Sequence, residues 1–194
     1  KKMTELYSLF ATPVAYFEHL ISEDECYSVC DQLLETQFLS HACLSFASSS
    51  HASSLQNNVL KDSLGESLLF KIQEKIDEYS NVCGLHDLTI TNMWHNVQER
   101  GSVLKNHRHP NSKVSGVLFL DVDEDSSKLY IENPNPFVKF EDYAEENEFN
   151  FYHTWFQPKR GDLILFPSWL EHGSNNDENK SDRRISVSFN THYK

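Results

Sequence analysis

Apolar residues in the first third of the chain recur with a helical period. Ser22 and Glu25 have the spacing of a capping box. The apolar stripe that follows comprises Cys26, Val29, Cys30, Leu33 and Leu34. A second stripe, which Ser63 and Glu66 can cap, comprises Leu68, Leu69, Ile72, Ile76 and Tyr79. The pattern predicts two amphipathic helices, the second ending at 81–84, with a loop over the Ser-, Ala- and Asn-rich residues between them at 45–58.

After residue 87 the sequence pattern changes to short apolar, β-branched and aromatic runs separated by polar turns. Such runs are typical of strands. We predict strands at residues 88–97, 115–122, 128–132, 161–167 and 184–193. In the last of these, Ile185, Val187 and Phe189 alternate with polar residues. Two helices followed by many antiparallel strands favour a mainly β fold with flanking helices, either a β-sandwich or a jelly roll.

A polar stretch at residues 133–152 is too long for a hairpin turn. It contains Pro134, Pro136 and an acidic run at 141–148. Loops of this length are usually functional or mobile, so we expect a lid-like insertion at 133–155. Its aromatic side chains would either cover a site or pack over the rim of the barrel. These residues are Phe137, Phe140, Tyr143, Phe149, Phe151, Tyr152 and Trp155.

Length and composition predict one domain. The 194 residues, 39% of them hydrophobic, can bury one substantial core. We therefore expect a single domain over 1–194, with a helical support region at 1–87 and a jelly-roll core at 88–194. The net charge of -12 argues against a nucleic-acid-coating or membrane-surface role. No apolar run approaches the roughly 18 to 20 residues of a membrane span, and the first five residues lack the apolar core of a signal peptide. These features predict a cytoplasmic protein.

The four cysteines carry no recognisable chemistry. Cys26, Cys30, Cys43 and Cys83 are too few and too irregularly spaced for a disulfide framework. A zinc site would need a second pair of comparable spacing near Cys26 and Cys30, and the sequence has none. We expect these residues to act as small buried hydrophobic side chains.

The sharpest chemical feature among the ten histidines is His107-Arg108-His109. On a strand, residues i and i+2 point to one face, so the two imidazoles would project together while Arg108 points away. Two imidazoles on one side can chelate a divalent metal. The alternative is a pair that merely faces water at the end of a strand.

A second segment, 161–172, supplies a third histidine. Its glycine begins an apolar strand, its proline ends that strand, and His172 follows. Strands that are distant in sequence face each other across a jelly roll, so His172 can join His107 and His109 around one metal ion. Three imidazoles leave coordination positions open for substrate and oxygen.

Arg184 and Ser186 share a face of the last predicted strand. A guanidinium beside a hydroxyl inside a barrel is a suitable clamp for a carboxylate, and a bidentate partner would offset the desolvation of the buried charge. A small diacid could place its far carboxylate there while its near end chelates the metal. The alternative is a surface ion pair, which we expect for the neighbouring Arg183.

These segments together resemble a family of 2-oxoglutarate- and iron(II)-dependent oxygenases that is common in bacteria and phages. The segments that carry the resemblance are 9–14, 94–96, 107–112, 115–120, 161–172 and 184–190, so it spans nearly the whole chain. It implies a double-stranded β-helix, Fe(II) and 2-oxoglutarate. It also implies a dioxygenase, expected to be a hydroxylase, that couples decarboxylation of 2-oxoglutarate to succinate with oxidation of an unidentified substrate.

The resemblance also implies residue roles. His107, His109 and His172 match the metal ligands, Arg184 matches the residue that binds the far carboxylate of 2-oxoglutarate, and Ser186 completes an Arg-x-Ser clamp. Asn96, in the segment Trp94-His95-Asn96, would face the cosubstrate.

The sequence departs from the wider superfamily at His109, where a carboxylate is usual. The resembled family tends to carry His-x-His there, so three histidines remain the expected ligands. An acidic side chain or water could also complete the site, with Asp121, Glu132 and Glu171 as candidates. Glu171 is the least suitable, because adjacent strand residues point to opposite faces.

Two other functions compete with the oxygenase. A cupin-like metalloenzyme would not use 2-oxoglutarate, but the usual glutamate after the His-x-His is missing and Arg184 would have no role. A non-catalytic jelly-roll binding module would retain the barrel and hold metal poorly. The substrate, a small molecule or a side chain, is not identified by the sequence, and exposed strand edges are compatible with a homodimer.

Overall fold

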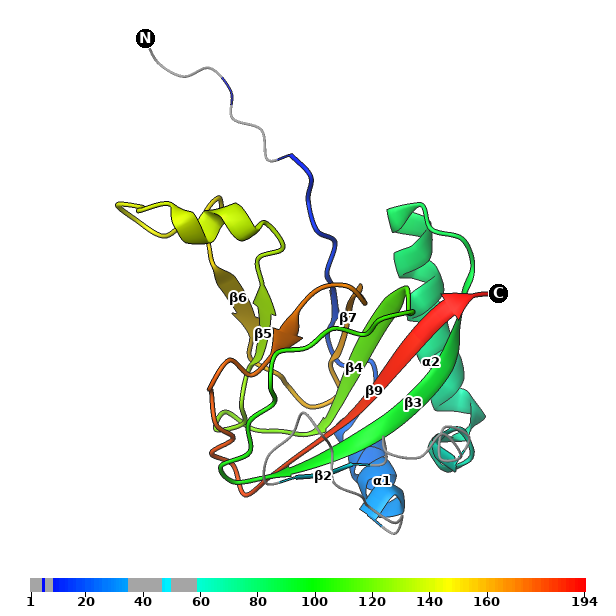
Figure 1. Ribbon diagram of the computed structural model, residues 1–194. Coiled ribbons are helices and arrows are strands. Elements are labelled where there is room, and N and C mark those ends of the chain that lie inside the picture. The colour runs from blue at the N-terminus through cyan, green and yellow to red at the C-terminus, as the bar shows by residue number, and fades with distance from the viewer. Residues whose placement is uncertain (1–4, 6–8, 35–46, 50–58) are drawn as a thin grey trace.

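The computed structural model describes residues 5, 9–34, 47–49 and 59–194 (Figure 1). Cys43, and most of the predicted loop at 45–58, lie outside these residues. The helices are α1 (Glu23–Leu34), α2 (Val59–Cys83) and the short 3-10 helix η1 (Pro136–Phe140). The strands are β1 (Ala15–Phe17), β2 (Ala47–Ser49), β3 (Leu88–Glu99), β4 (Val114–Asp121), β5 (Leu129–Glu132), β6 (His153–Phe156), β7 (Leu163–Pro167), β8 (His172–Gly173) and β9 (Arg183–Tyr193).

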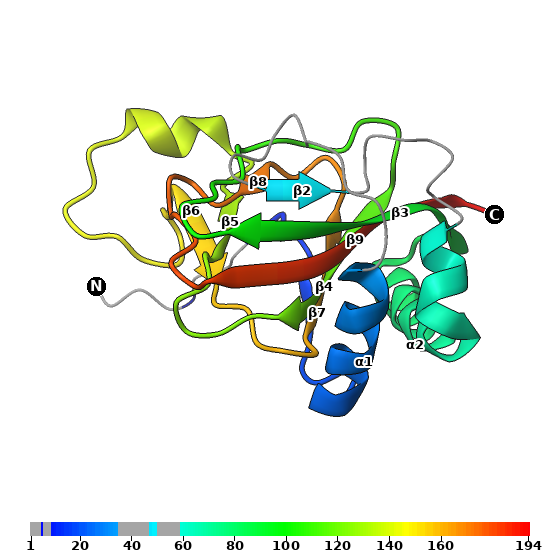
Figure 2. The ribbon, with the colours of Figure 1, turned by 90° about the horizontal axis from the view of Figure 1, so that it is seen from below.

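The strands form two antiparallel sheets. The large sheet has the order β1-β7-β4-β9-β3-β2, and the small sheet has the order β6-β5-β8. Helices α1 and α2 lie on one side of the large sheet, and the small sheet lies on the other (Figures 1 and 2). One apolar core joins the helices to the large sheet, and a second lies between the sheets. This is the predicted mainly β architecture, a jelly roll buttressed by helices.

Helix α1 begins as its sequence predicts. The Ser22 N–H donates to a Glu25 carboxylate oxygen at 2.9 Å, and the Glu25 N–H donates to the Ser22 hydroxyl at 3.2 Å, which is the reciprocal capping box. Cys26 and Cys30 are buried on its inner face. Burial raises the pKa of the Cys26 thiol to about 11 and that of Cys30 to about 12, so neither is a ready nucleophile.

Helix α2 begins earlier than the capping pattern predicts. The helical span starts at Val59, but Gly65, with φ 73° and ψ 153°, interrupts it before the predicted apolar stripe. Glycine tolerates this conformation, so the chain can change direction there without a side-chain clash. The side chain of Ser63 lies outside the described part of the chain. After the interruption, Leu68, Ile72 and Ile76 are buried as predicted.

The five predicted strands are confirmed within one or two residues at each end. Strands β1, β2, β6 and β8 were not predicted from the sequence. Each has two to four residues, which is too short for a visible alternation of apolar and polar positions. Their pairing comes from the neighbouring strand, as β1 pairs with β7 and β2 with β3.

The predicted insertion at 133–155 is only partly a loop. It contains η1, and its last residues form β6, which pairs with β5 through Glu132 and His153. Several of its aromatic side chains are exposed, including Phe137, Phe140 and Phe149. They therefore do not all pack over the rim of the barrel.

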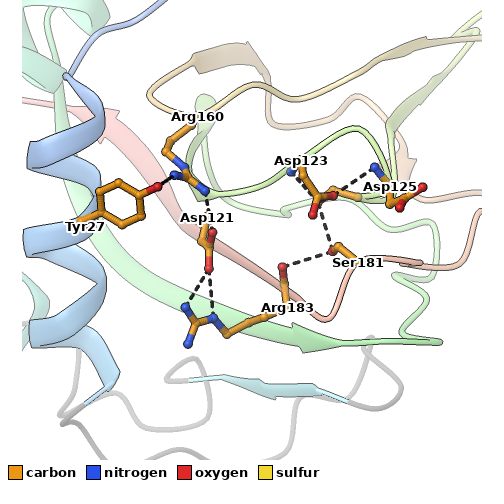
Figure 3. Close-up of polar contacts among 8 residues, drawn as sticks. Tyr27, Asp121, Asp123, Asp125, Arg160, Ser181 and Arg183 are labelled. Atoms are coloured by element: carbon orange, nitrogen blue, oxygen red, sulfur yellow. Dashed lines mark hydrogen bonds and ion pairs between the residues drawn. The ribbon is translucent and has the colours of Figure 1, made fainter.

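Asp121, at the end of β4, joins three parts of the molecule (Figure 3). Its carboxylate accepts hydrogen bonds from Arg160 at 2.8 Å and from Arg183 at 2.8 and 3.0 Å. Arg160 also donates to the hydroxyl of Tyr27 on α1. The predicted surface ion pair of Arg183 is thereby confirmed.

Within the described residues, no helix is long and apolar enough to cross a membrane.

Candidate metal centre

Three histidines from two distant segments meet at one end of the space between the sheets. The backbones of His107 and His172 pair as an antiparallel bridge, with N–H to oxygen distances of 2.9 and 3.1 Å. The ring centroids lie 4.5 Å apart for His107 and His172, 5.1 Å for His109 and His172, and 5.0 Å for His107 and His109. One potential ligand nitrogen from each ring lies within 4.8 Å of the other two. The predicted convergence of the three imidazoles is therefore present.

The strand that was expected to carry His107 and His109 is absent. His107 forms an isolated bridge, and His109 lies outside any strand. The His109 N–H instead donates to the Ser168 carbonyl at 2.9 Å. The two imidazoles still point to one side because both residues hydrogen-bond to the same facing segment, which contains Ser168 and His172.

Backbone carbonyls orient two of the rings. Nδ1 of His107 lies 2.8 Å from the Lys105 carbonyl oxygen, and Nδ1 of His172 lies 2.9 Å from that of Leu170. A carbonyl oxygen only accepts hydrogen bonds, so each Nδ1 carries the proton and each Nε2 keeps a free lone pair. This is the arrangement by which second-layer hydrogen bonds prepare histidine as a metal ligand.

Burial keeps these rings neutral. It lowers the pKa of His107, and it lowers the pKa of His172 to about 3, with the neighbouring His107 acting in the same direction. A neutral imidazole can bind a metal without first losing a proton. Three imidazole nitrogen donors suit a divalent transition metal such as Fe(II), so the residues fit the ion that the sequence predicts.

No carboxylate belongs to this cluster in the described residues. The three acidic candidates are engaged elsewhere. Asp121 binds Arg160 and Arg183, Glu132 pairs with Lys139 at 2.9 Å, and Glu171 pairs with Arg108 at 2.6 Å. Arg108 lines a different pocket from the three imidazoles, in keeping with the expectation that it points away from them.

A cavity extends from the histidines between the sheets. Alternate residues of two neighbouring strands provide its polar wall: Trp94, Asn96 and Gln98 from β3, and Arg184, Ser186 and Ser188 from β9. The strand register pairs Asn96 with Ser186 and Gln98 with Arg184. Apolar side chains, including Val117, Leu129 and Phe166, line the remainder. The predicted cosubstrate residues therefore share one cavity with the predicted metal ligands.

Arg184 is the charged group of this cavity. Its side chain is buried, and its guanidinium lies 5.2 Å from the centre of the Phe119 ring. Burial lowers its pKa to about 10, against an opposing effect of the Asp177 charge, so it stays protonated at neutral pH. Nη1 donates to the Gln98 side-chain oxygen, while Nε has no hydrogen-bond partner. A buried cation with an unpaired N–H fits an anionic ligand such as one carboxylate of a diacid.

A buried hydrogen-bond network supports the metal end of the cavity and was not predicted. The Ser115 hydroxyl lies 2.8 Å from the Ser168 hydroxyl and donates to the Asn190 side-chain oxygen at 2.7 Å. The backbone carbonyl of Ser168 also accepts a hydrogen bond from the His109 N–H. The network ties β4 and β9 to the turn that precedes His172. Serines carry no pattern that distinguishes such a network from ordinary strand positions.

Gln98 was also missed, although the sequence held a signal for it. It lies two residues after Asn96, so strand alternation places both on one face. The predicted strand stopped at residue 97, and extending it by one residue would have placed this amide on the same face as Asn96.

Known proteins resemble this chain in sequence and in fold. A family model described as a 2OG-Fe(II) oxygenase matches residues 92–190, a span that contains every predicted site residue. A comparison with curated proteins finds no match.

Solved structures of similar fold include HygX from Streptomyces hygroscopicus with nickel, 2-oxoglutarate and hygromycin B bound. It has 12% identity and a TM-score of 0.62, covering 94% of this chain and 83% of that chain. A Pseudomonas putida prolyl-4-hydroxylase has 12% identity and a TM-score of 0.61, covering 94% of each chain. The epimerase SnoN from nogalamycin biosynthesis has 12% identity and a TM-score of 0.66, covering 94% of this chain and 77% of that chain. At these identities the likeness establishes the fold, a double-stranded β-helix.

Proposed function

This chain belongs to the family of 2-oxoglutarate- and Fe(II)-dependent oxygenases, and we propose that its cavity between the sheets is the active site. In this proposal His107, His109 and His172 hold the iron. Arg184 and Ser186 bind the far carboxylate of 2-oxoglutarate, and Asn96 faces the cosubstrate. The observation that carries the proposal is the presence of three convergent imidazoles and one buried guanidinium in the same cavity.

Each residue has a distinct task in this site. Iron(II) and 2-oxoglutarate, when bound, supply the oxidising chemistry together with dioxygen. The imidazoles provide three nitrogen ligands and leave the remaining coordination positions for the cosubstrate and oxygen. Arg184 contributes the charge that selects a diacid, and Ser186 adds a hydroxyl on the same strand face. Val117, Leu129 and Phe166 limit the entry of water.

The buried guanidinium favours the oxygenase over a cupin-like metalloenzyme. A cupin site leaves Arg184 without a role, whereas a diacid cosubstrate gives its charge a partner.

The domain assignment is also part of the proposal: one domain over 1–194, with a helical support region at 1–87, a jelly-roll core at 88–194 and a lid-like insertion at 133–155. Strands β1 and β2 add residues of the support region to the large sheet.

We infer that the substrate is a small molecule or an amino-acid side chain. The similar structures include HygX with hygromycin B bound and SnoN in complex with a nogalamycin compound, and those ligands are small molecules. The net charge of -12 opposes binding to bare nucleic acid. The outer strands β1, β2 and β6 are sheet edges within the described residues, and such edges are compatible with a homodimer. The free thiols of Cys26, Cys30 and Cys83 are consistent with a reducing, cytoplasmic setting.

The direct test is the formation of succinate from 2-oxoglutarate. We expect succinate only when Fe(II) and oxygen are both present, and we expect its loss in the variants His172→Ala and Arg184→Met. Arg100→Met is a matched control, because Arg100 forms an exposed ion pair with Asp182 away from the cavity. Succinate formation that is independent of Fe(II), or unchanged in both cavity variants, would contradict the proposed site.

A further inference from the structure

We propose that Gln98 is a positioning residue that holds the Arg184 guanidinium through a neutral hydrogen bond and so keeps its positive charge available to the cosubstrate. This inference rests on the proposed function, because it takes Arg184 as the residue that binds the far carboxylate of 2-oxoglutarate. The inference adds Gln98 to the predicted site residues and gives a reason why an uncharged amide stands at this position.

The contacts of Gln98 form a short buried chain. Gln98 and Arg184 are directly opposite each other on β3 and β9, and the Gln98 oxygen accepts from Nη1 of Arg184. The Gln98 amide nitrogen donates to the hydroxyl of Ser102 at 3.2 Å. Gln98 is 2% exposed and Ser102 is 0% exposed. The amide therefore has one partner on each side, which fixes its orientation and, through it, that of the guanidinium.

Among the residues that the structure describes, no ion pair neutralises the charge of Arg184, although the Asp177 carboxylate, beyond ion-pair distance, favours that charge. Within the described residues, no carboxylate lies within ion-pair distance of it. The polar residues beside it in the cavity, Asn96, Ser186 and Ser188, are neutral. Nε also remains without a partner. An unpaired buried cation lowers the stability of the empty protein but attracts an anion strongly.

The residue type at position 98 is therefore expected to set the selectivity for the ligand's tail. Glutamate has nearly the same shape as glutamine and would form an internal ion pair with Arg184. The Ser102 hydroxyl could turn to donate to the new carboxylate, so the substitution keeps its second partner. The internal ion pair would compete with the far carboxylate of a diacid. It would have little effect on a 2-oxo acid with an uncharged tail.

The test compares two ligands on the Mn(II)-loaded protein by calorimetry. 2-Oxoglutarate and 2-oxopentanoate share the chelating head, but only the first has a tail carboxylate. We expect Gln98→Glu to weaken 2-oxoglutarate binding by about 30-fold or more while changing 2-oxopentanoate binding less than about threefold. We expect Arg184→Met to remove the same preference. Equal weakening of both ligands in Gln98→Glu, or no weakening of 2-oxoglutarate, would overturn the inference.

Two further variants keep the outcome interpretable. Gln98→Met removes the hydrogen bonds without adding charge, and we expect an intermediate, tail-selective loss of about tenfold. If Gln98→Glu does not fold, the same two-ligand comparison on Gln98→Met decides the inference, and a loss without tail selectivity would reject it. If Arg184→Met retains the preference for 2-oxoglutarate, the proposed role of Arg184 fails. If Arg184→Met loses the preference for 2-oxoglutarate but the Gln98 variants retain it, the inference about Gln98 fails while the proposed role of Arg184 stands.

Discussion

The two faces of the large sheet differ in chemistry although the same strands form both. On β9, Ile185 and Val187 belong to the core shared with the helices, whereas Arg184 and Ser186 line the cavity. Neighbouring strand residues point to opposite faces, so a shift of one residue separates an apolar environment from a polar one. The apolar face favours folding through burial, while the polar face holds an unpaired charge that opposes it. Stability and ligand binding should therefore respond to different substitutions.

The largest expected effect on stability is on the helix-facing side. Phe189 is fully buried, and its ring occupies the space that a side chain at Gly116 would need, since a Cβ there would lie 2.2 Å from the Phe189 Cζ. Phe189→Ala should lower the free energy of unfolding by about 3–5 kcal/mol. Urea denaturation measures the loss, and metal titration of the folded protein should give unchanged affinity.

A double variant tests whether the two positions complement each other. Gly116→Ala should destabilise the wild-type protein but should cost less when Phe189→Ala has removed the ring. Additive effects of the two substitutions would contradict this account of the packing.

On the cavity face, the expected change is in binding rather than in folding. Arg184→Met replaces a buried charge with an apolar side chain of similar length, so the free energy of unfolding of the metal-free protein should stay equal or rise by about 1–4 kcal/mol. Affinity for 2-oxoglutarate should fall by about 30-fold or more. Denaturation and calorimetry on the same preparation measure both. A clear loss of stability would show that Arg184 is structural.

His95 makes the helix-facing side sensitive to acid. It is 1% exposed, and burial lowers its pKa to about 4 from about 6.5. The unfolded chain therefore binds more protons between these values, and the free energy of unfolding falls as the pH falls from about 6.5 to about 4. The slope from one histidine is at most about 1.4 kcal/mol per pH unit. His95→Gln should reduce the slope of a pH series of denaturation curves, and identical slopes would contradict the assignment.

The smallest effect is expected far from the cavity, at the start of α1. Ser22→Ala removes one half of the capping box and should lower the free energy of unfolding by about 1 kcal/mol. Ser22→Asp, which can accept the same hydrogen bond, should restore it. Both variants should bind Mn(II) and 2-oxoglutarate like the wild-type protein, and altered binding would show that the two faces are not independent.

The features predicted from the sequence are those that depend on local pattern. The capping box of Ser22 and Glu25, the apolar stripe of α1 and the alternation along β9 all follow from the spacing of neighbouring residues. The three histidines could be predicted because the expected jelly roll brings together segments 63 residues apart, and the family resemblance pointed to the same residues. Without it, the spacing of His107 and His109 alone left a surface pair equally open.

The remaining features depend on contacts that local pattern does not contain. Strand β8 has two residues and exists because His172 pairs with Ile131 of β5 and with His107. The same tertiary pairing, rather than a strand, aligns His107 with His109. The partner of Arg184 could not be read from spacing either, because it requires the register of β3 against β9.

The carbonyl contacts of His107 and His172 have a practical consequence. Lys105 and Leu170 hold these rings through the chain itself, so their orientation does not depend on an occupant. A chelator should remove the metal ion while the backbone around the three histidines keeps its conformation. Adding metal ion again should refill the site without a refolding step. The protein should therefore be suited to exchange of one transition metal for another, including spectroscopic substitutes for iron.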